Sequence, residues 1–479
     1  METAKERKQL DMLHGPIWDK IPRFALPIAA TAILGQLFNA ADIAVVGNFT
    51  GDLRTASVAA VSATSAIIGL VINLFIGISL GANVTIAYAV GQRDEQAVSR
   101  AVHTAIVLAV LGGLLAATVG ELIAAPLLEA LRTPDEVFPL ALLYLRIYFA
   151  GLPVIMLYNF EAAIFRSVGE TKIPLMALTL SGILNVILNL FFVAILHMTV
   201  DGVATATVIA NAVSAAILYY KLRRTDRIIR VSPKALRIDV KSMKRMLRIG
   251  LPAGLQSAVF SVANIIIQSA INSLGTIVMA ASGASFNIEI ITYNILNSFS
   301  QACTTFVGQN YGAGDVKRCK RTMLLCLLEG AIALALAIAL ILPFGKQLLS
   351  VFNNDPQVID VGYIRLVTLM TAHIFSLCYE VLSGYLRGFG ISVLPAVLTM
   401  VGVCGTRLSW IYWVFPKSQT FQTIMAVFPI SLALTALLML IAVLCCRPAR
   451  RFAAERYRKK RQPTGCRFFI CNFVIIRNG

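Results

Sequence analysis

The chain has 479 residues, of which 58% are hydrophobic and only 14% are charged, and its formal net charge is +18. Soluble globular proteins contain roughly half apolar and a quarter charged residues, so this composition excludes a soluble fold and makes lipid the main solvent of the chain. One transmembrane helix needs ~20 apolar residues. Uncharged stretches of at least that length occur at 55–92, 173–200, 249–288, 290–314 and 418–446.

Twelve transmembrane helices are predicted. The first follows the mixed polar residues 1–23 and runs directly into the second, so we expect it to remain as an anchor and not to be cleaved as a signal peptide. Gly, Pro and polar clusters divide the longer apolar stretches. The predicted helices lie near 24–46, 56–80, 102–126, 139–162, 174–196, 202–220, 246–272, 277–308, 322–344, 361–385, 391–415 and 421–446. The predicted fold class is therefore an all-α polytopic membrane protein.

The basic residues are distributed unevenly between the two sides of this predicted bundle. With twelve helices, one side holds 35 of the 42 Lys and Arg residues, whereas the loops on the other side hold four. Positive charge concentrates in the cytoplasmic loops of membrane proteins, which predicts that both termini and the central connector are cytoplasmic. Topology and anionic lipid headgroups then explain the net charge, so no nucleic-acid partner is predicted.

The sequence also contains an internal repeat. Ala25-Leu26-Pro27 with Asn39 matches Gly250-Leu251-Pro252 with Asn264 at a shift of 225 residues. Further pairs match at shifts of 219 to 221, namely 91–100 with 312–321, Arg146 and Glu161 with Arg365 and Glu380, and Pro174 with Pro395. Chance matches would scatter, so we infer a duplication into two parallel six-helix repeats related by an axis along the membrane normal.

The predicted domain boundaries follow from the repeat and from the charge. They are a cytoplasmic N-terminus at 1–23, an N-terminal lobe at 24–220, a basic cytoplasmic linker at 221–245, a C-terminal lobe at 246–446 and a basic cytoplasmic C-terminus at 447–479. Two parallel repeats suit alternating access, so the expected substrate path is a cleft between the lobes.

Motifs for nucleotide binding or catalysis are weak. No G-x-x-x-x-G-K-[ST] loop occurs, so we expect an ion gradient to supply the energy and predict no cofactor. The pentad from Gly77 to Gly81 matches the G-x-S-x-G hydrolase pattern, but within a long apolar helix Gly-xxx-Gly is an ordinary close-packing face. The nine cysteines contain no C-x-x-C pair, so neither disulfides nor a metal site is predicted. An intramembrane enzyme remains a remote alternative.

Asp42 is the leading candidate for ion coupling. It lies late in the first predicted helix, in an otherwise uncharged span. Ionisable residues inside a membrane are costly and mark ion or substrate paths. Desolvation favours the neutral form of a carboxyl group, which would let this one exchange protons. The alternative is a structural carboxylate beside a kink produced by Pro27.

Other intramembrane polar residues form a second group of candidates for the substrate or ion path. Asn185 and Asn189 are four residues apart on the fifth helix, so both face one way and could bond Asp42, a substrate or another helix. Glu289 and Arg407 lie in the second half, where Glu–Arg pairing and substrate contact are both open for Arg407. The candidates for this path are Asn39, Asn185, Asn189, Asn264, Glu289 and Arg407.

The sequence resembles the multidrug and toxic compound extrusion family over roughly residues 15–446. The first helix carries the family's Leu-Pro, Asn, Asp and Val-Gly, and both halves carry its Gly-x-x-Asp followed by Arg. Further matches to its Leu-Arg-Gly-x-Gly and Gly-Val-Ala segments lie at 166–174, 386–390 and 201–204. The residues 462–479 resemble nothing in the family.

This resemblance implies a secondary antiporter. Protons or sodium ions would enter while organic cations, drugs or toxic metabolites leave, with Asp42 as the coupling acid of the N-terminal lobe. Some members of the family have Asn-xxx-Asp on the fifth helix, whereas this chain has Asn185 and Asn189. A cation site that needs two acids is thereby weakened, so protons are preferred to sodium.

The expected partners are a small, cationic substrate and the lipid bilayer. We expect a monomeric, multi-pass protein of the plasma membrane, with the bacterial inner membrane as the favoured location. The main competing function is a flippase or exporter of a lipid-linked saccharide or a lipid. Flippases favour basic clefts and cation exporters acidic ones; the first half offers one clear acid, whereas the second half has mixed charge.

Overall fold

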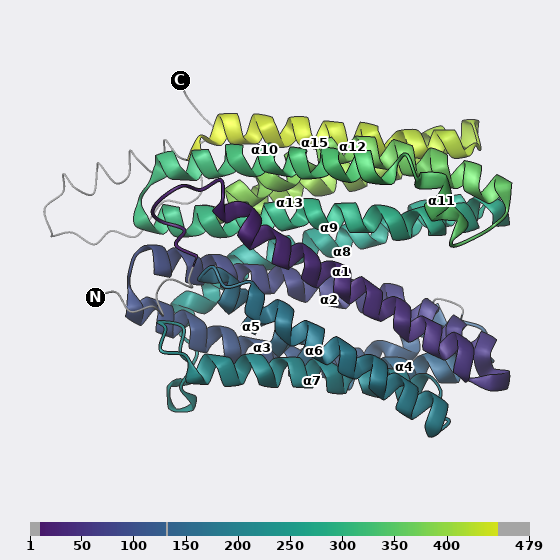
Figure 1. The fold of residues 1–479 in the computed structure, drawn as a ribbon, viewed down its shortest axis with the longest axis horizontal. Helices are drawn as coiled ribbons and strands as arrows, with labels where there is room; N and C mark the ends of the chain where they lie inside the picture. Colours follow the sequence, from purple (N-terminus) through teal and green to yellow (C-terminus); the bar gives the residue numbers. More distant parts are fainter. Residues whose placement is uncertain (1–9, 131–132, 449–479) are drawn as a thin grey trace, which may run out of the picture.

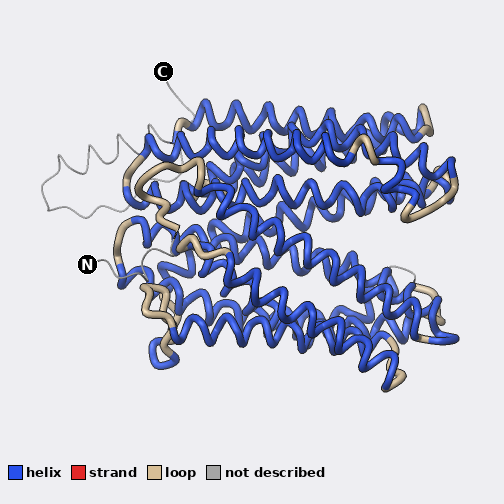
Figure 2. Tube along the Cα trace, viewed as in Figure 1, coloured by secondary structure: helices blue, strands red, loops and turns tan. Residues whose placement is uncertain are grey.

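The structure is a computed structural model that describes residues 10–130 and 133–448. The outer parts of the two predicted cytoplasmic termini, 1–9 and 449–479, lie outside the described residues. In the part of the chain that the structure describes, all regular structure is helical (Figure 2). The predicted all-α fold is therefore confirmed.

The helices of the first half have bounds close to the predicted ones but extend further at most ends. They are α1 (Lys20–Phe49), α2 (Arg54–Gly91), α3 (Glu95–Ala130), α4 (Phe138–Ala150), α5 (Leu152–Ser167), α6 (Lys172–Asn189) with its π-helical continuation η3 (Leu190–Ile195), and α7 (Val200–Arg224). Helices α4 and α5 meet at a bend of 48°, and together they are long and apolar enough to form one span.

The second half follows the same order after a non-helical connector at 225–239, broken only by a short 3₁₀ turn, η4 (Pro233–Ala235). Its helices are α8 (Val240–Asn272), α9 (Thr276–Ala313), α10 (Val316–Ile341), the short α11 (Gly345–Ser350), α12 (Pro356–Gly388) and α15 (Phe421–Cys446). The eleventh span, 393–417, is irregular. It consists of α13 (Val393–Thr399), π-helical η5 (Met400–Gly405), α14 (Thr406–Ser409), π-helical η6 (Trp410–Val414) and 3₁₀-helical η7 (Phe415–Lys417).

Ten helices of the described residues are long and apolar enough to cross a membrane, or eleven with the bent pair α4 and α5 as one span. The remaining predicted span is α9, a helix of 38 residues. It is rich in Ser, Thr, Asn and Gln, and twenty of its residues are buried. Because neighbouring helices cover α9, it does not need the apolar surface that contact with lipid demands.

The two lobes touch at one end of the bundle and diverge toward the other (Figure 1). We call the touching end the basic end, because the connector 225–239, which belongs to the basic linker, lies there together with the start of α1. Helix α1 crosses between the lobes. Its first turns pack on the second lobe, where Phe24 meets Phe306 of α9 at 5.7 Å between ring centroids, and its later turns pack with Val45 and Val46 in the first lobe.

Glycines bring the two lobes together near the basic end. Gly77 and Gly81 of α2 face Gly254 and Gly250 of the antiparallel helix α8. A Cβ atom on Gly77 would lie 2.2 Å from the backbone nitrogen of Gly254, and one on Gly81 would lie 2.1 Å from the carbonyl oxygen of Met246. We call these four residues the glycine seam. The predicted Gly-xxx-Gly packing face is thus confirmed, and its partner is the opposite lobe.

The repeat is visible in matching local devices. Asp94 precedes α3 and accepts a hydrogen bond from the backbone N–H of Ala97, and Asp315 precedes α10 and accepts one from that of Arg318, both at 2.9 Å. The π-helical segments η3 and η6 also lie at similar places, toward the end of the fifth span of each lobe. The paired Gly-x-x-Asp motifs therefore satisfy free N–H groups at helix starts.

Replacing Asp315 by Ala is expected to destabilise the chain by about 1 kcal/mol, because the N–H of Arg318 loses its capping acceptor. Thermal unfolding of the purified chain measures the effect. Asp315→Asn is the matched control, since Asn caps helices as well as Asp. Equal destabilisation by Asn and Ala would show that the charge, and not the cap, matters at this position.

Candidate functional site

Asp42 lies near the end of α1 that is remote from the basic end, and only 5% of its surface is exposed. The local packing is tight because Gly182 of α6 leaves room for Phe38 of α1: a Cβ atom on Gly182 would lie 1.8 Å from the Phe38 ring. Tyr144 and Tyr148 of α4 are buried in the same part of the lobe. The carboxyl group is thus held within the first lobe among α1, α4, α6 and α7.

Three polar side chains surround this carboxyl group. Asn189 donates from Nδ2 to Oδ1 of Asp42 at 2.5 Å, and Thr207 of α7 donates from Oγ1 to Oδ2 at 3.3 Å. Asn185 lies one turn before Asn189, and its Oδ1 accepts from Asn189 Nδ2 at 3.4 Å. Asn185 also donates from Nδ2 to Thr207 Oγ1 at 3.3 Å. We call Asp42, Asn185, Asn189 and Thr207 the Asp42 site.

One acceptor in the Asp42 site is unsatisfied. The Oδ1 atom of Asn189 is buried and has no hydrogen-bond partner among the described residues. A buried polar atom without a partner costs free energy, so the site favours the arrival of a proton donor or a cation. The chemistry that it offers is reversible binding of a positive charge between a carboxylate and amide oxygens.

The structure brings some of the predicted first-lobe residues together and separates one. Asp42, Asn185 and Asn189 share one hydrogen-bond network. Asn39 is exposed on α1 and forms no hydrogen bond with this network in the described structure. Thr207 was missed by the sequence prediction, because a Thr in an apolar helix usually bonds its own backbone. Its hydroxyl does bond Val203 O at 3.0 Å as well.

In the second lobe, Glu289 of α9 is paired with Arg365 of α12. Arg365 Nη2 lies 2.7 Å from Glu289 Oε1, Nε donates to Oε2 at 3.3 Å, and Nη1 donates to Ser282 Oγ at 2.6 Å. Both side chains are buried, so the fork geometry offsets the loss of water. Glu289 is therefore paired with Arg365 and not with Arg407, the arginine for which the sequence left pairing open.

Arg407 of α14 has neutral partners instead. Its Nη1 donates to Asn264 Oδ1 of α8 at 3.0 Å, and its Nε donates to Ser431 Oγ of α15 at 3.3 Å. The guanidinium lies over the rings of Phe428 and Phe260, at 4.6 and 5.2 Å from their centroids. Asn264 and Arg407, both predicted candidates, are thus in direct contact.

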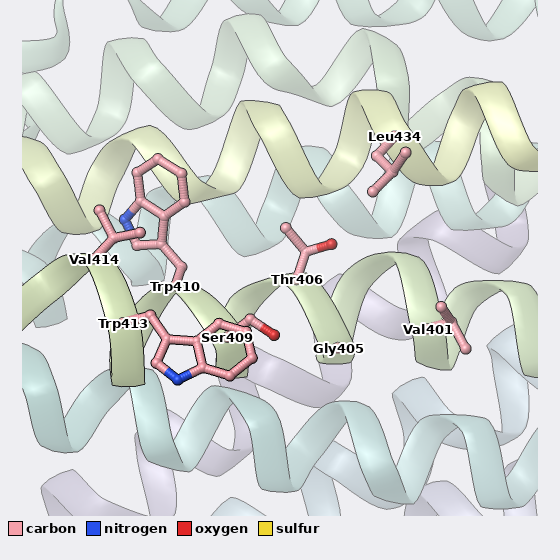
Figure 3. Close-up of a pocket in the computed structure, with 8 residues that line it drawn as sticks. All are labelled: Val401, Gly405, Thr406, Ser409, Trp410, Trp413, Val414 and Leu434. Carbon is pink, nitrogen blue, oxygen red and sulfur yellow. The ribbon is translucent and has the colours of Figure 1, made fainter.

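A groove of about 460 Å³ lies on the eleventh span and α15 (Figure 3). It is lined by Val401, Gly405, Thr406, Ser409, Trp410, Trp413, Val414 and Leu434. Trp413 is 72% exposed and no lining residue is charged. Such a lining suits contact with lipid chains. Arg407 does not line this groove, so the candidate polar sites lie elsewhere.

Comparison with protein families gives one match, to the MatE family, over residues 27–191 and 252–413. The two matched segments correspond to the two halves of the repeat.

Several named proteins are similar to this chain over most of their length. The "probable multidrug resistance protein YoeA" of Bacillus subtilis is 25% identical, over 85% of this chain and 89% of that protein. The "probable multidrug resistance protein NorM" of Thermotoga maritima is 25% identical, over 81% of this chain and 83% of that protein. An FAD transporter of Shewanella oneidensis is 24% identical, over 73% and 77%.

Solved structures share the fold. A crystal structure described as "MATE in complex with MaL6" superposes with a TM-score of 0.84 at 21% identity, covering 94% of this chain and 99% of that chain. An outward-facing multidrug resistance MATE transporter of the MOP superfamily superposes with a TM-score of 0.83, at the same identity and coverage. At this level of identity, the likeness concerns the fold alone.

Proposed function

This chain belongs to the MatE family of multidrug and toxic compound extrusion transporters, and we propose that it exports organic cations, drugs or toxic metabolites in exchange for protons or sodium ions. The family consists of transporters and not of enzymes, and its members need no cofactor. Relatives named as multidrug resistance and multidrug export proteins support drug export as the activity.

Alternating access between the lobes would move the substrate. The proposal is supported by the position of the inter-lobe contacts, which lie toward the basic end. Asn83 of α2 donates to Thr305 of α9 at 2.9 Å, and Gln309 of α9 donates to the carbonyl oxygen of Ser167 at 2.6 Å. With the glycine seam, these contacts close the basic end while the helices diverge at the other end (Figure 1). Under the predicted topology, this state opens outward.

The single observation that carries the proposed coupling is the Asp42 site. It holds one buried carboxyl group and one unsatisfied amide oxygen at the end of the lobe that would face outward. A proton or a sodium ion bound there would neutralise Asp42 and change the contacts of α1 with α6 and α7. Because α1 also packs on the second lobe, ion binding could then bias the position of the two lobes.

The coupling ion is proposed to be a proton. Sodium ions in proteins require several oxygen ligands, and a second acid would strengthen such a site. Here Asn189 occupies the position one turn after Asn185, and Asp42 is the one acid of the Asp42 site. A site with one carboxyl group and otherwise uncharged side chains can hold a proton without further charged ligands.

Substrate-stimulated proton flux in vesicles tests the proposed function. The full chain is reconstituted with a pH dye inside, and the organic cation rhodamine 123 is added with and without a sodium gradient. We expect proton flux that depends on rhodamine 123 and persists without sodium. Proton flux that requires sodium would reassign the coupling ion. Movement of rhodamine 123 that needs neither a proton gradient nor a sodium gradient would contradict antiport.

Export of a lipid-linked saccharide or a lipid is the second candidate function. The observation in its favour is the buried guanidinium of Arg407, because a flippase for an anionic headgroup needs basic side chains in its path. The same vesicles can distinguish the two functions. Scrambling of a fluorescent anionic lipid analogue, without proton flux on addition of rhodamine 123, would favour the flippase.

A further inference from the structure

Arg407 is a buried cation without a charged partner. Only 3% of its surface is exposed. Among the described residues, no carboxylate lies within ion-pair distance of it, whereas Glu289 is already paired with Arg365. Its third nitrogen, Nη2, makes no hydrogen bond within the described chain. A lone buried charge is costly, so a counter-ion from outside the chain would stabilise it.

The neutral groups around Arg407 orient the guanidinium but do not neutralise it. Asn264 and Ser431 each accept one hydrogen bond, and Phe260 and Phe428 lie over the guanidinium. Arginine presents a planar fork of donors that matches the two oxygens of a carboxylate or a phosphate. With Nε and Nη1 fixed by Ser431 and Asn264, the remaining donors are held in place for one such group.

The Arg407 pocket is the repeat-related counterpart of the Asp42 site. Its three polar residues come from α8, the eleventh span and α15, which are the first, fifth and sixth spans of the second lobe. The Asp42 site uses α1, α6 and α7, which are the first, fifth and sixth spans of the first lobe. The same three positions in each lobe therefore build a polar pocket.

The sign of the charge differs between the two pockets. At the shift of 225, Asp42 corresponds to Ile267, which is buried. Asn185 lies eleven residues after Pro174, and Arg407 lies twelve residues after Pro395. The π-helical segment η5 lies before Arg407 and has no counterpart before Asn185 in α6. A π-bulge adds one residue to a helix, which accounts for the offset and brings Arg407 to the position of Asn185.

The Arg407 pocket lies beside the surface between the lobes. Ser261 of α8 accepts a hydrogen bond from Asn73 of α2, in the opposite lobe, at 3.4 Å. Asn264 lies three residues further along α8, away from the basic end, and therefore on the same face of the helix. Asn264 is exposed. A group that enters between the diverging lobes would therefore reach Asn264 and, behind it, Arg407.

We propose that the pocket of Asn264, Arg407 and Ser431 binds an oxyanion, either a carboxylate or a phosphate, carried by the transported molecule. The proposal rests on the proposed function, because it assigns a substrate class to the same transporter. Substrates that combine a positive charge with an oxyanion would then be preferred over simple cations. The first lobe would bind the coupling ion while the second lobe reads the negative group.

Two dyes that differ at one carboxyl group test this inference. Rhodamine 110 has a free carboxylate, and rhodamine 123 is its methyl ester. Binding to the purified full chain is measured by fluorescence polarisation, which does not require transport. We expect the wild type to bind rhodamine 110 more tightly. Arg407→Gln should weaken the binding of rhodamine 110 about tenfold or more, as expected for loss of a charge-assisted hydrogen bond. The binding of rhodamine 123 should change less than about threefold.

A second variant keeps the inference testable if Arg407→Gln does not fold. Asn264→Asp would place a carboxylate beside Nη1, where Asn264 Oδ1 now lies at 3.0 Å, and would neutralise the guanidinium internally. Asn264→Asp should weaken the binding of rhodamine 110 as strongly as Arg407→Gln does, although it retains the buried Arg407. The matched control is Arg146→Gln, because Arg146 is half-exposed in the first lobe and pairs with Glu121 at 2.8 Å. Binding of both dyes should be unchanged in this control.

Inorganic phosphate distinguishes the two possible sources of the oxyanion. Displacement of rhodamine 110 by phosphate at constant ionic strength would show that a free oxyanion also fits, and lack of displacement would show that the group must belong to a larger molecule. Both results agree with an oxyanion site. An equal loss of affinity for the two dyes in Arg407→Gln, or no preference of the wild type for rhodamine 110, would overturn the oxyanion site. A failure of the proposed antiport would instead be seen as absent proton flux in the vesicles, so the two failures can be distinguished.

Discussion

Asp42→Asn is expected to reduce ion-driven export of an organic cation at least tenfold, while the chain remains folded. The amide has the shape of the carboxyl group but cannot take up or release a proton. Its carbonyl oxygen can still accept the bond that Asn189 donates to Asp42 at 2.5 Å. The cost to stability should therefore stay at about 1 kcal/mol, the usual net value of one hydrogen bond. Efflux of rhodamine 123 from cells that carry the variant measures the loss.

Two controls separate coupling from folding. Asp360→Asn removes an exposed carboxylate that pairs with Lys346 at 2.7 Å on the surface, and it should leave efflux unchanged. Asp42→Glu keeps an acid within the same pocket and should retain part of the activity. If Asp42→Asn exports normally and collapse of the proton gradient still stops export, Asp42 has no role in coupling.

The fold could be predicted from the sequence because the physical constraint is simple. A helix that crosses lipid must be apolar and must satisfy its own backbone, so spans and repeats are visible in the chain. Helix ends were less accurate. The second helix was predicted at 56–80, whereas α2 runs from Arg54 to Gly91. Hydropathy reports only the part within lipid, and the hydrogen bonds of a helix continue into water.

The candidate sites could be predicted in part. Asp42, Asn185 and Asn189 were recognisable because polar residues in apolar helices are rare, and their i, i+4 spacing fixes their common face. Thr207 and Ser431 carried no such signal, because hydroxyl side chains are common in apolar helices. The contact of Arg407 with Asn264 joins residues 143 positions apart, and the π-helical segment η5 shifts the register. Periodicity alone does not reveal either fact.

Gly81→Ala is the second substitution with a large expected effect, a loss of most transport. A Cβ atom at this position would lie 2.1 Å from the carbonyl oxygen of Met246 and 2.8 Å from the nitrogen of Gly250. Both are backbone atoms, so no side chain can rotate away and α2 must separate from α8. The state that is closed at the basic end then loses a close backbone contact between the lobes. Each 1.4 kcal/mol lost there lowers its population relative to the alternative state about tenfold.

Gly69→Ala on the same helix is the matched control, because a Cβ atom there has nothing within 4 Å. Both substitutions favour the helix by up to about 1 kcal/mol, since Ala is a better helix former than Gly. They differ only in the contact across the glycine seam. Rhodamine 123 efflux should therefore fall with Gly81→Ala and persist with Gly69→Ala. Equal activity of the two variants would mean that transport does not require the lobes to approach as closely at the basic end as α2 and α8 do here.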